Sequence, residues 1–198
     1  MAPGEVGSTM SNDLDTAPAA AGLDVSRLFD IVEMLVSPVS RYAGRPADGA
    51  APTPPDEIVD RIELRAGLGV VGDRYFNRPA HRRGSITLQA AESLAAAAVE
   101  LGAATIGLAQ TRRTLLTRGL DLAALLGRDV EIDSGDGPVV LRVHRPAPPC
   151  AWMDVAIAPG AHAALRGRGG VRAEPLTDGV LRLGSARLRV LARSDPES

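Results

Sequence analysis

Short apolar runs, each closed by a turn signal, dominate the pattern of hydrophobic and polar positions after about residue 25. The run at 29–36 is typical of a strand and ends at Ser37-Pro38. Similar runs predict further strands at 58–64, 86–88, 114–117, 130–132, 139–143, 171–175, 180–183 and 187–191. An Asp-Gly pair at 178–179 separates two of them and predicts a hairpin.

One segment, 90–101, carries a clear helical pattern. It is rich in Ala, has apolar residues at 94, 98 and 101, and is followed by Gly102 as a stop. A shorter helix is expected at 121–126, ended by Gly127. Prolines make 43–56 a loop. Many short strands with few helices predict a mainly β, barrel-like domain.

The chain of 198 residues has room for one domain with tails. Residues 1–24 are rich in Gly, Ser, Ala, Pro and Asp without periodicity, so we expect a disordered tail there. The domain is expected over 25–193, with a short tail at 194–198. Its core must be aliphatic, because aromatic residues make up only 3% of the chain.

A glycine-rich stretch at 67–72 matches G-x-G-x-x-G, the phosphate loop of dinucleotide-binding folds. Such a fold needs a helix to begin at the third glycine, since the helix N-terminus holds the pyrophosphate. Pro79 and Gly84 break any helix after Gly72. We therefore interpret the stretch as a turn that presents Asp73 and Arg74 to a pocket.

All 22 basic residues are arginines. The absence of lysine excludes an internal pyridoxal phosphate aldimine, and every cationic contact must come from a guanidinium, which suits phosphate and carboxylate. Residues 1–60 are acidic and residues 61–118 are basic, while the net charge is −2. This balance, with few aromatic rings for base stacking, disfavours nucleic acid and favours a small anionic ligand.

Cys150 is the only cysteine, which excludes an internal disulfide. The three histidines have no metal-ligand spacing. No signal peptide or membrane-spanning apolar stretch is visible, so a cytoplasmic protein without membrane contact is expected.

Two arginine-rich segments are candidate anion sites. If 114–117 is a strand, Arg112 and Arg118 point to one face and could clamp a phosphate, or they are solvated surface arginines. The loop at 166–172, with Arg168 and Gly169, could offer guanidinium and backbone N–H groups to an anion, or it carries scattered charge.

The proline-rich stretch 146–149 stiffens the approach to Cys150. A lone cysteine is commonly a small buried hydrophobe. A rigid loop at a strand end is also where a thiolate ligand or nucleophile is held. Both interpretations stay open at this point.

Five segments in order resemble the MOSC family, named after the C-terminal domain of molybdenum cofactor sulfurases, in its short stand-alone bacterial type. The matching segments cover roughly residues 30 to 192 and read G-V-V-G-D-R-Y, S-I-T-L-Q-A-A-E-S-L, R-R-T-L-L-T-R-G-L-D-L-A-A-L-L-G, R-P-A-P-P-C-A and G-R-G-G-V-R-A. The resemblance implies a MOSC-type β-barrel-like fold.

The resemblance also implies binding of the molybdenum cofactor (molybdopterin), with Cys150 as molybdenum ligand or persulfide carrier. The residues that would surround the cofactor are Gly72, Asp73, Arg74, Arg112, Arg113, Thr114, Arg118, Arg168 and Gly169. Relatives often have Asn at the position of Thr114 and a second cysteine at that of Ala147.

Two functions follow as expectations from the resemblance. The first is a molybdenum-dependent oxidoreductase that reduces N-hydroxylated or similar small molecules with electrons from a separate redox protein. The second is a non-catalytic carrier of the cofactor or of cysteine-bound sulfur. A third alternative is a degenerate member that binds something else.

Overall fold

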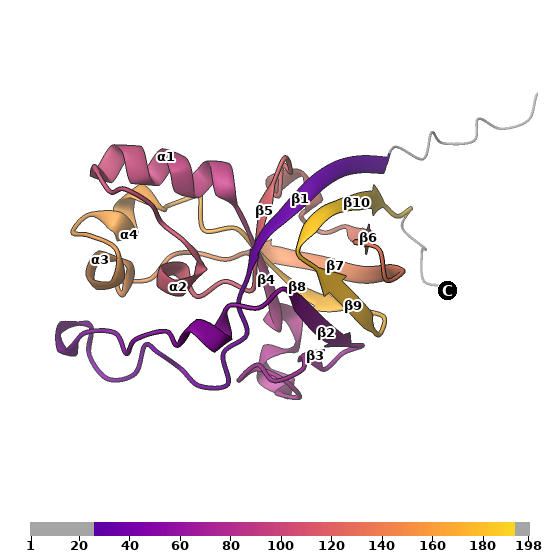
Figure 1. Cartoon of the computed structure of the whole chain (residues 1–198), viewed down its shortest axis with the longest axis horizontal. Coiled ribbons are helices and arrows are strands. Elements are labelled where there is room, and N and C mark those ends of the chain that lie inside the picture. Colours follow the sequence, from indigo (N-terminus) through magenta and orange to yellow (C-terminus); the bar gives the residue numbers. More distant parts are fainter. Residues whose placement is uncertain (1–25, 193–198) are drawn as a thin grey trace, which may run out of the picture.

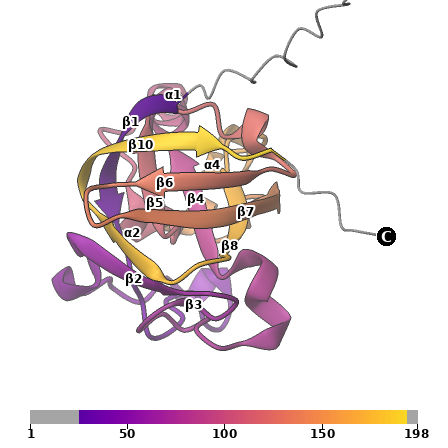
Figure 2. The same cartoon turned by 90° about the vertical axis from the view of Figure 1, so that its right-hand side faces the viewer.

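Seven strands close into a barrel in the computed structural model, which describes residues 26–192. The barrel order is β1-β10-β6-β7-β8-β4-β5, and Figure 2 shows β10, β6 and β7 side by side. Neighbouring strands are antiparallel except for β4 and β5, which are parallel. The barrel strands are β1 (Ser26–Met34), β4 (Ile86–Ala90), β5 (Leu115–Arg118), β6 (Asp129–Asp133), β7 (Pro138–Pro146), β8 (Val171–Pro175) and β10 (Gly184–Val190).

A small second sheet packs against the barrel. It has the order β3-β2-β9, formed by β2 (Arg61–Arg65), β3 (Gly69–Val70) and β9 (Gly179–Arg182). Its apolar side chains Ile62, Leu64 and Leu181 belong to the same buried cluster as the barrel interior. The cluster is aliphatic except for Phe29, as the low aromatic content requires.

The α-helices of the described residues lie on one flank of the barrel (Figure 1). They are α1 (Ala91–Leu101), α2 (Leu108–Thr111), α3 (Met153–Ala156) and α4 (Ala161–Ala164). The chain between the parallel strands β4 and β5 must cross back, and α1 lies in this crossover. A second apolar cluster, which includes Leu94 of α1 and Leu116 of β5, joins the helices to the barrel wall.

Short 3₁₀ turns fill several connections: η1 (Pro46–Asp48), η2 (Pro55–Glu57), η3 (Pro79–Gly84) and η4 (Ala123–Leu125). The residues after Gly72 form turns and then η3, so no helix begins at the glycine-rich stretch. None of the helices among residues 26–192 has the length and hydrophobicity to cross a membrane. The predicted tails at 1–24 and 194–198 lie outside the described residues.

The structure confirms the mainly β barrel and the long helix, whose C-cap Gly102 adopts φ 63°. The predicted hairpin around Asp178-Gly179 is wrong, because β9 pairs with β2 and not with β8. Asp178 accepts hydrogen bonds from Ala66 N at 2.8 Å and Arg65 Nη1 at 2.9 Å. These contacts direct the chain from the barrel into the small sheet.

Candidate functional site

A cleft of about 190 Å³ lies where the barrel wall meets the helical flank, and we call it the arginine cleft. The pairing of the strands places the residues that form its floor. Thr87 pairs with Arg172 across β4 and β8, and Thr114 stands beside Thr87 just before β5. The cleft brings together six of the residues singled out from the sequence: Asp73, Arg74, Arg112, Arg113, Thr114 and Cys150.

Arg112 is the most buried of these cations, and it is neutralised. It is the C-cap of α2 in the left-handed conformation, with φ 57°. Its Nη2 donates to Glu57 Oε2 at 2.9 Å, and its Nη1 donates to Thr53 at 2.8 Å. Arg41 donates to the other oxygen of Glu57. Arg112 therefore ties the proline-rich loop to the helical flank.

Burial raises the pKa of Glu57, but hydrogen bonds from Arg41 and Arg112 outweigh it, so this pKa lies below its ordinary value. The carboxylate is charged at neutral pH and balances part of the two guanidinium charges.

Arg113 organises the loop that carries the cysteine. Its Nε donates to Gly169 O at 3.0 Å, and its Nη2 donates to Ala147 O and Pro148 O, both at 3.0 Å. Burial and the neighbouring charge of Arg172 lower the pKa of Arg113 to about 10, so it keeps its proton at neutral pH. A planar fork is needed for this contact set, and lysine could not reproduce it.

Arg172 also lines the cleft, and it ends the segment 166–172 that the sequence marked as a candidate anion site, in which only Arg168 and Gly169 were singled out. The Nε of Arg172 is buried without a hydrogen-bond partner in the described residues. Neither Arg172 nor Arg113 forms an ion pair with a carboxylate within residues 26–192. Two neighbouring guanidiniums without a counter-charge give this part of the cleft a positive charge that favours an anionic group. The local signal was its place in that arginine- and glycine-rich segment, which did not tell Arg172 from Arg168.

Thr114 and Asp73 hold the walls of the cleft. Thr114 N donates to Thr87 Oγ1 at 2.9 Å, and Thr87 N donates to Thr114 Oγ1 at 3.1 Å. Asp73 accepts from Ser37 N at 3.3 Å and Tyr75 N at 2.9 Å. These contacts fix the floor and the turn that follows Gly72.

Arg74 lies over the ring of Tyr75, with its guanidinium carbon 4.4 Å from the ring centroid. Its Nη1 is 3.8 Å from Asp73 Oδ2, which makes a weak ion pair. The predicted turn therefore presents both Asp73 and Arg74 to the cleft, and Tyr75 lines it as well.

Cys150 is exposed at the edge of the cleft and is not the buried hydrophobe considered from the sequence. Its carbonyl accepts from Met153 N at 3.0 Å, which begins the turn into α3. Beside it Trp152 stacks on Tyr42, with ring centroids 5.1 Å apart and planes within 3°. Burial raises the pKa of Tyr42 to about 12, and its hydroxyl donates to Gln110 O.

Four predicted residues do not line the arginine cleft. Gly72 lies just before the turn that presents Asp73 and does not itself form part of the cleft wall. Arg118 is at the exposed end of β5, and the same-face argument with Arg112 is wrong because the strand begins only at Leu115. Arg168 pairs with Glu100 at 2.7 Å and lines a different cavity. Gly169 serves the cleft only through its carbonyl, which accepts from Arg113.

Among residues 26–192, no three His, Cys, Asp or Glu side chains gather to hold a metal ion. A metal at Cys150 would need further donors from a bound group. A dithiolene cofactor brings its own sulfur ligands and a phosphate, so its needs from the protein are one thiolate and cationic donors. The residues of the arginine cleft match this set.

Comparisons with solved structures reveal the same fold at low sequence identity. YuaD from Bacillus subtilis matches with a TM-score of 0.65 and 14% identity, over 86% of this chain and 100% of that one. YiiM from Escherichia coli matches with a TM-score of 0.52 and 20% identity, over 70% of this chain and 66% of that one.

YiiM from Geobacillus stearothermophilus matches with a TM-score of 0.51 and 17% identity, over 83% of this chain and 76% of that one. No family model and no curated protein sequence matches the chain. At these identities the likeness shows the fold alone, a barrel consistent with the MOSC type that the sequence predicts.

Proposed function

We propose that this protein binds the molybdenum cofactor in the arginine cleft, with Cys150 as the protein ligand of the metal. The observation that carries the proposal is an exposed thiol on the same cleft as Arg113 and Arg172, two neighbouring guanidiniums without a carboxylate partner in the described residues. Arg172 Nε, a buried donor without a partner there, is the group we assign to the cofactor phosphate.

The size of the cleft sets how such a cofactor is held. Its volume of about 190 Å³ is smaller than the usual range for small-molecule pockets, about 300–1,000 Å³. The cleft would therefore hold only the phosphate end of the cofactor. Arg74 and Tyr75 at the mouth provide a cationic and an aromatic surface.

We further propose that the protein is an oxidoreductase that reduces N-hydroxylated or similar compounds. In the balanced reaction the N–O bond of R–NHOH breaks, two electrons and two protons enter, and R–NH₂ and water leave. The cofactor, when bound, would supply the two electrons, and a separate redox protein would replace them. Arg113 keeps the cysteine loop in place, and its charge together with that of Arg172 favours an anionic group in the cleft.

The exposure of Cys150 also favours the second candidate, a carrier of cofactor or of persulfide sulfur. A sulfur atom on an exposed thiol can pass to an acceptor that has no access to a buried one. The carrier and the enzyme share the binding site and differ in turnover.

The test of the proposed function is the reduction of a hydroxylamine by the purified protein with an artificial electron donor. We expect turnover with the natural sequence and none with Cys150→Ala, because that variant lacks the metal ligand. Arg118→Gln is the matched control, since Arg118 lies outside the cleft, and it should retain activity. A native mass one sulfur atom heavier, lost in Cys150→Ala and accompanied by no turnover, would contradict the enzyme and support the carrier.

A further inference from the structure

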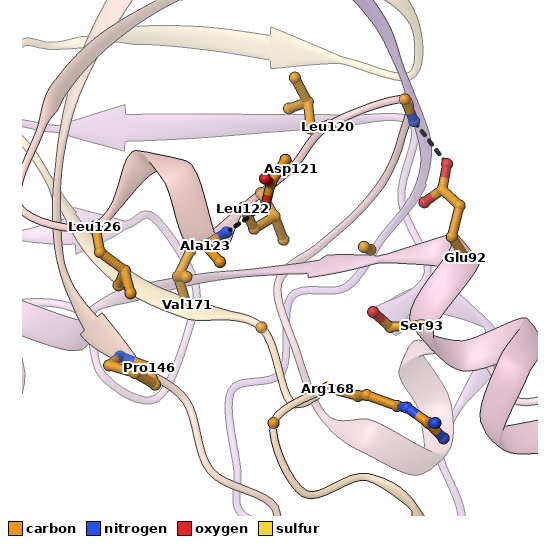
Figure 3. A pocket seen from close by; sticks show the side chains of 14 residues that line it. Glu92, Ser93, Leu120, Asp121, Leu122, Ala123, Leu126, Pro146, Arg168 and Val171 are labelled. Atoms are coloured by element: carbon orange, nitrogen blue, oxygen red, sulfur yellow. Dashed lines mark hydrogen bonds between the residues drawn. The ribbon is translucent and has the colours of Figure 1, made fainter.

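A second cavity of about 560 Å³ lies at the opposite ends of β4 and β5 from the arginine cleft. The cleft is lined by Thr87 and Thr114 near the starts of these strands. The second cavity is lined by Ala90 and Gly119 where they end, and Figure 3 shows it from close by. The two share no lining residue. We call the second one the leucine cavity.

Apolar side chains form most of the wall of the leucine cavity. Leu120 and Leu122 are only 7% and 6% exposed, so they form a buried part of the wall. Leu126 is more exposed and lies at the rim. Pro146 and Val171 close the wall from β7 and β8. Its volume falls in the range of about 300–1,000 Å³ typical of small-molecule sites. The cavity is therefore suited to an apolar body of drug-like size.

The charged side chains around the cavity do not balance one another. Glu92 accepts from Gly119 N at 2.8 Å, and Asp121 accepts from Ala123 N at 3.0 Å (Figure 3). Neither carboxylate has an ion-pair partner within residues 26–192. The one cation of the wall, Arg168, is already paired with Glu100 at 2.7 Å. The lining therefore carries uncompensated negative charge.

In Figure 3 one carboxylate lies at an edge of the lining and the other among its apolar side chains, since Asp121 lies beside Leu120 and Leu122. Glu92 and Ser93 of α1 lie on the right, and Leu126 and Pro146 lie on the left. A ligand that satisfies both the carboxylates and the apolar side chains has a cationic head and an apolar body. An apolar anion would meet two carboxylates, and a neutral hydrocarbon would leave both without a counter-charge.

We propose that the leucine cavity binds a hydrophobic organic amine in its protonated form, a function separate from that of the arginine cleft. The ammonium group lies toward Glu92 and Asp121, and the alkyl or aryl body packs against the leucines. The proposal does not depend on a cofactor in the arginine cleft, because the two sites share no lining residue.

The experiment is calorimetric titration of the full chain at neutral pH with two probes of similar size, 2-phenylethylammonium and 3-phenylpropanoate. We expect the ammonium to bind and the carboxylate to bind at least tenfold more weakly. Glu92→Gln and Asp121→Asn should each weaken the ammonium about threefold, the size of a partly exposed charge pair. Asp121→Asn keeps a side-chain oxygen that can accept the hydrogen bond from Ala123 N at the start of η4.

Asp60→Asn is the matched control, because it removes one exposed carboxylate away from this lining and should leave the affinity unchanged. Ala123→Phe fills the cavity from an exposed position and should abolish binding without unfolding the protein. Cys150→Ala should bind the ammonium as the natural sequence does. Equal or tighter binding of the carboxylate, no binding of the ammonium, or an equal loss in Asp60→Asn would each overturn the proposal.

Discussion

Glu57→Gln is expected to lower the free energy of unfolding by about 3–5 kcal/mol, the usual cost of breaking a buried ion pair from one side. The Glu57 and Arg112 side chains are only 4% and 5% exposed, and their N–O distance is 2.9 Å. Glutamine keeps the shape and one acceptor, but it leaves the guanidinium of Arg112 buried without a counter-charge. Urea unfolding of both proteins at pH 7 measures the difference.

The matched control is Glu100→Gln, which breaks the exposed pair with Arg168 and should cost less than about 1 kcal/mol. The pKa of Glu57 is lowered in the folded state, so its contribution is present above the ordinary value of 4.5 and is lost as pH falls through the lower folded pKa. The stabilities of the natural sequence and Glu57→Gln should therefore converge in acid. A difference that stayed constant down to pH 2 would contradict this ion-pair explanation.

Gly169→Ala is the second substitution with a large expected effect. It should lower the free energy of unfolding by about 3 kcal/mol and displace the loop that carries Cys150. A Cβ at Gly169 would lie 2.1 Å from the carbonyl oxygen of Ala147, which also accepts from Arg113. The backbone there cannot yield without losing that hydrogen bond. The alkylation rate of Cys150 together with urea unfolding measures both consequences.

Gly167→Ala is the control in the same loop. Gly167 has φ 73°, and a Cβ there meets nothing within 4 Å. Its cost is limited to backbone strain of about 1 kcal/mol, and the reactivity of Cys150 should stay unchanged. Equal effects of the two substitutions would show that Gly169 has no special contact with the cysteine loop.

Local patterns predicted most of the elements. The run at 171–175 became β8 with the same bounds, and Gly102 ends α1 in the left-handed conformation. The short helices α2, α3 and α4 were missed because four residues are too few for a periodic pattern. Their positions depend on packing against the barrel wall through the second apolar cluster.

The site was predictable only in part, because a cleft is made by contacts between distant segments. Asp73, Arg113 and Cys150 lay in recognisable segments and do line the cleft. Arg172 and Tyr42 join them through strand register and a ring stack, which no local pattern reveals. The alternation of side chains along a strand misplaced Arg118 relative to Arg112, because Arg112 is the left-handed C-cap of α2 and not part of the strand.

The arginines of the cleft have different roles, which their number in the sequence does not reveal. Arg112 is neutralised by Glu57, and Arg113 donates to backbone carbonyls. Arg112 and Arg172 each keep a buried Nε without a partner in the described residues, and Arg172 is the one of the two that has no ion pair there. Arg112 and Arg113 therefore form the framework of the cleft, while Arg172 of β8 is the group that we propose binds the anion.

The most direct test of the central claim is the molybdenum and pterin content of the full chain, purified from a host that makes the cofactor. We expect about one molybdenum and one pterin per chain, and a reduced content of both in Arg172→Gln, whose fold should be unaffected because Arg172 has no ion pair to lose within residues 26–192. Neither molybdenum nor pterin in the natural protein would contradict the assignment of the arginine cleft.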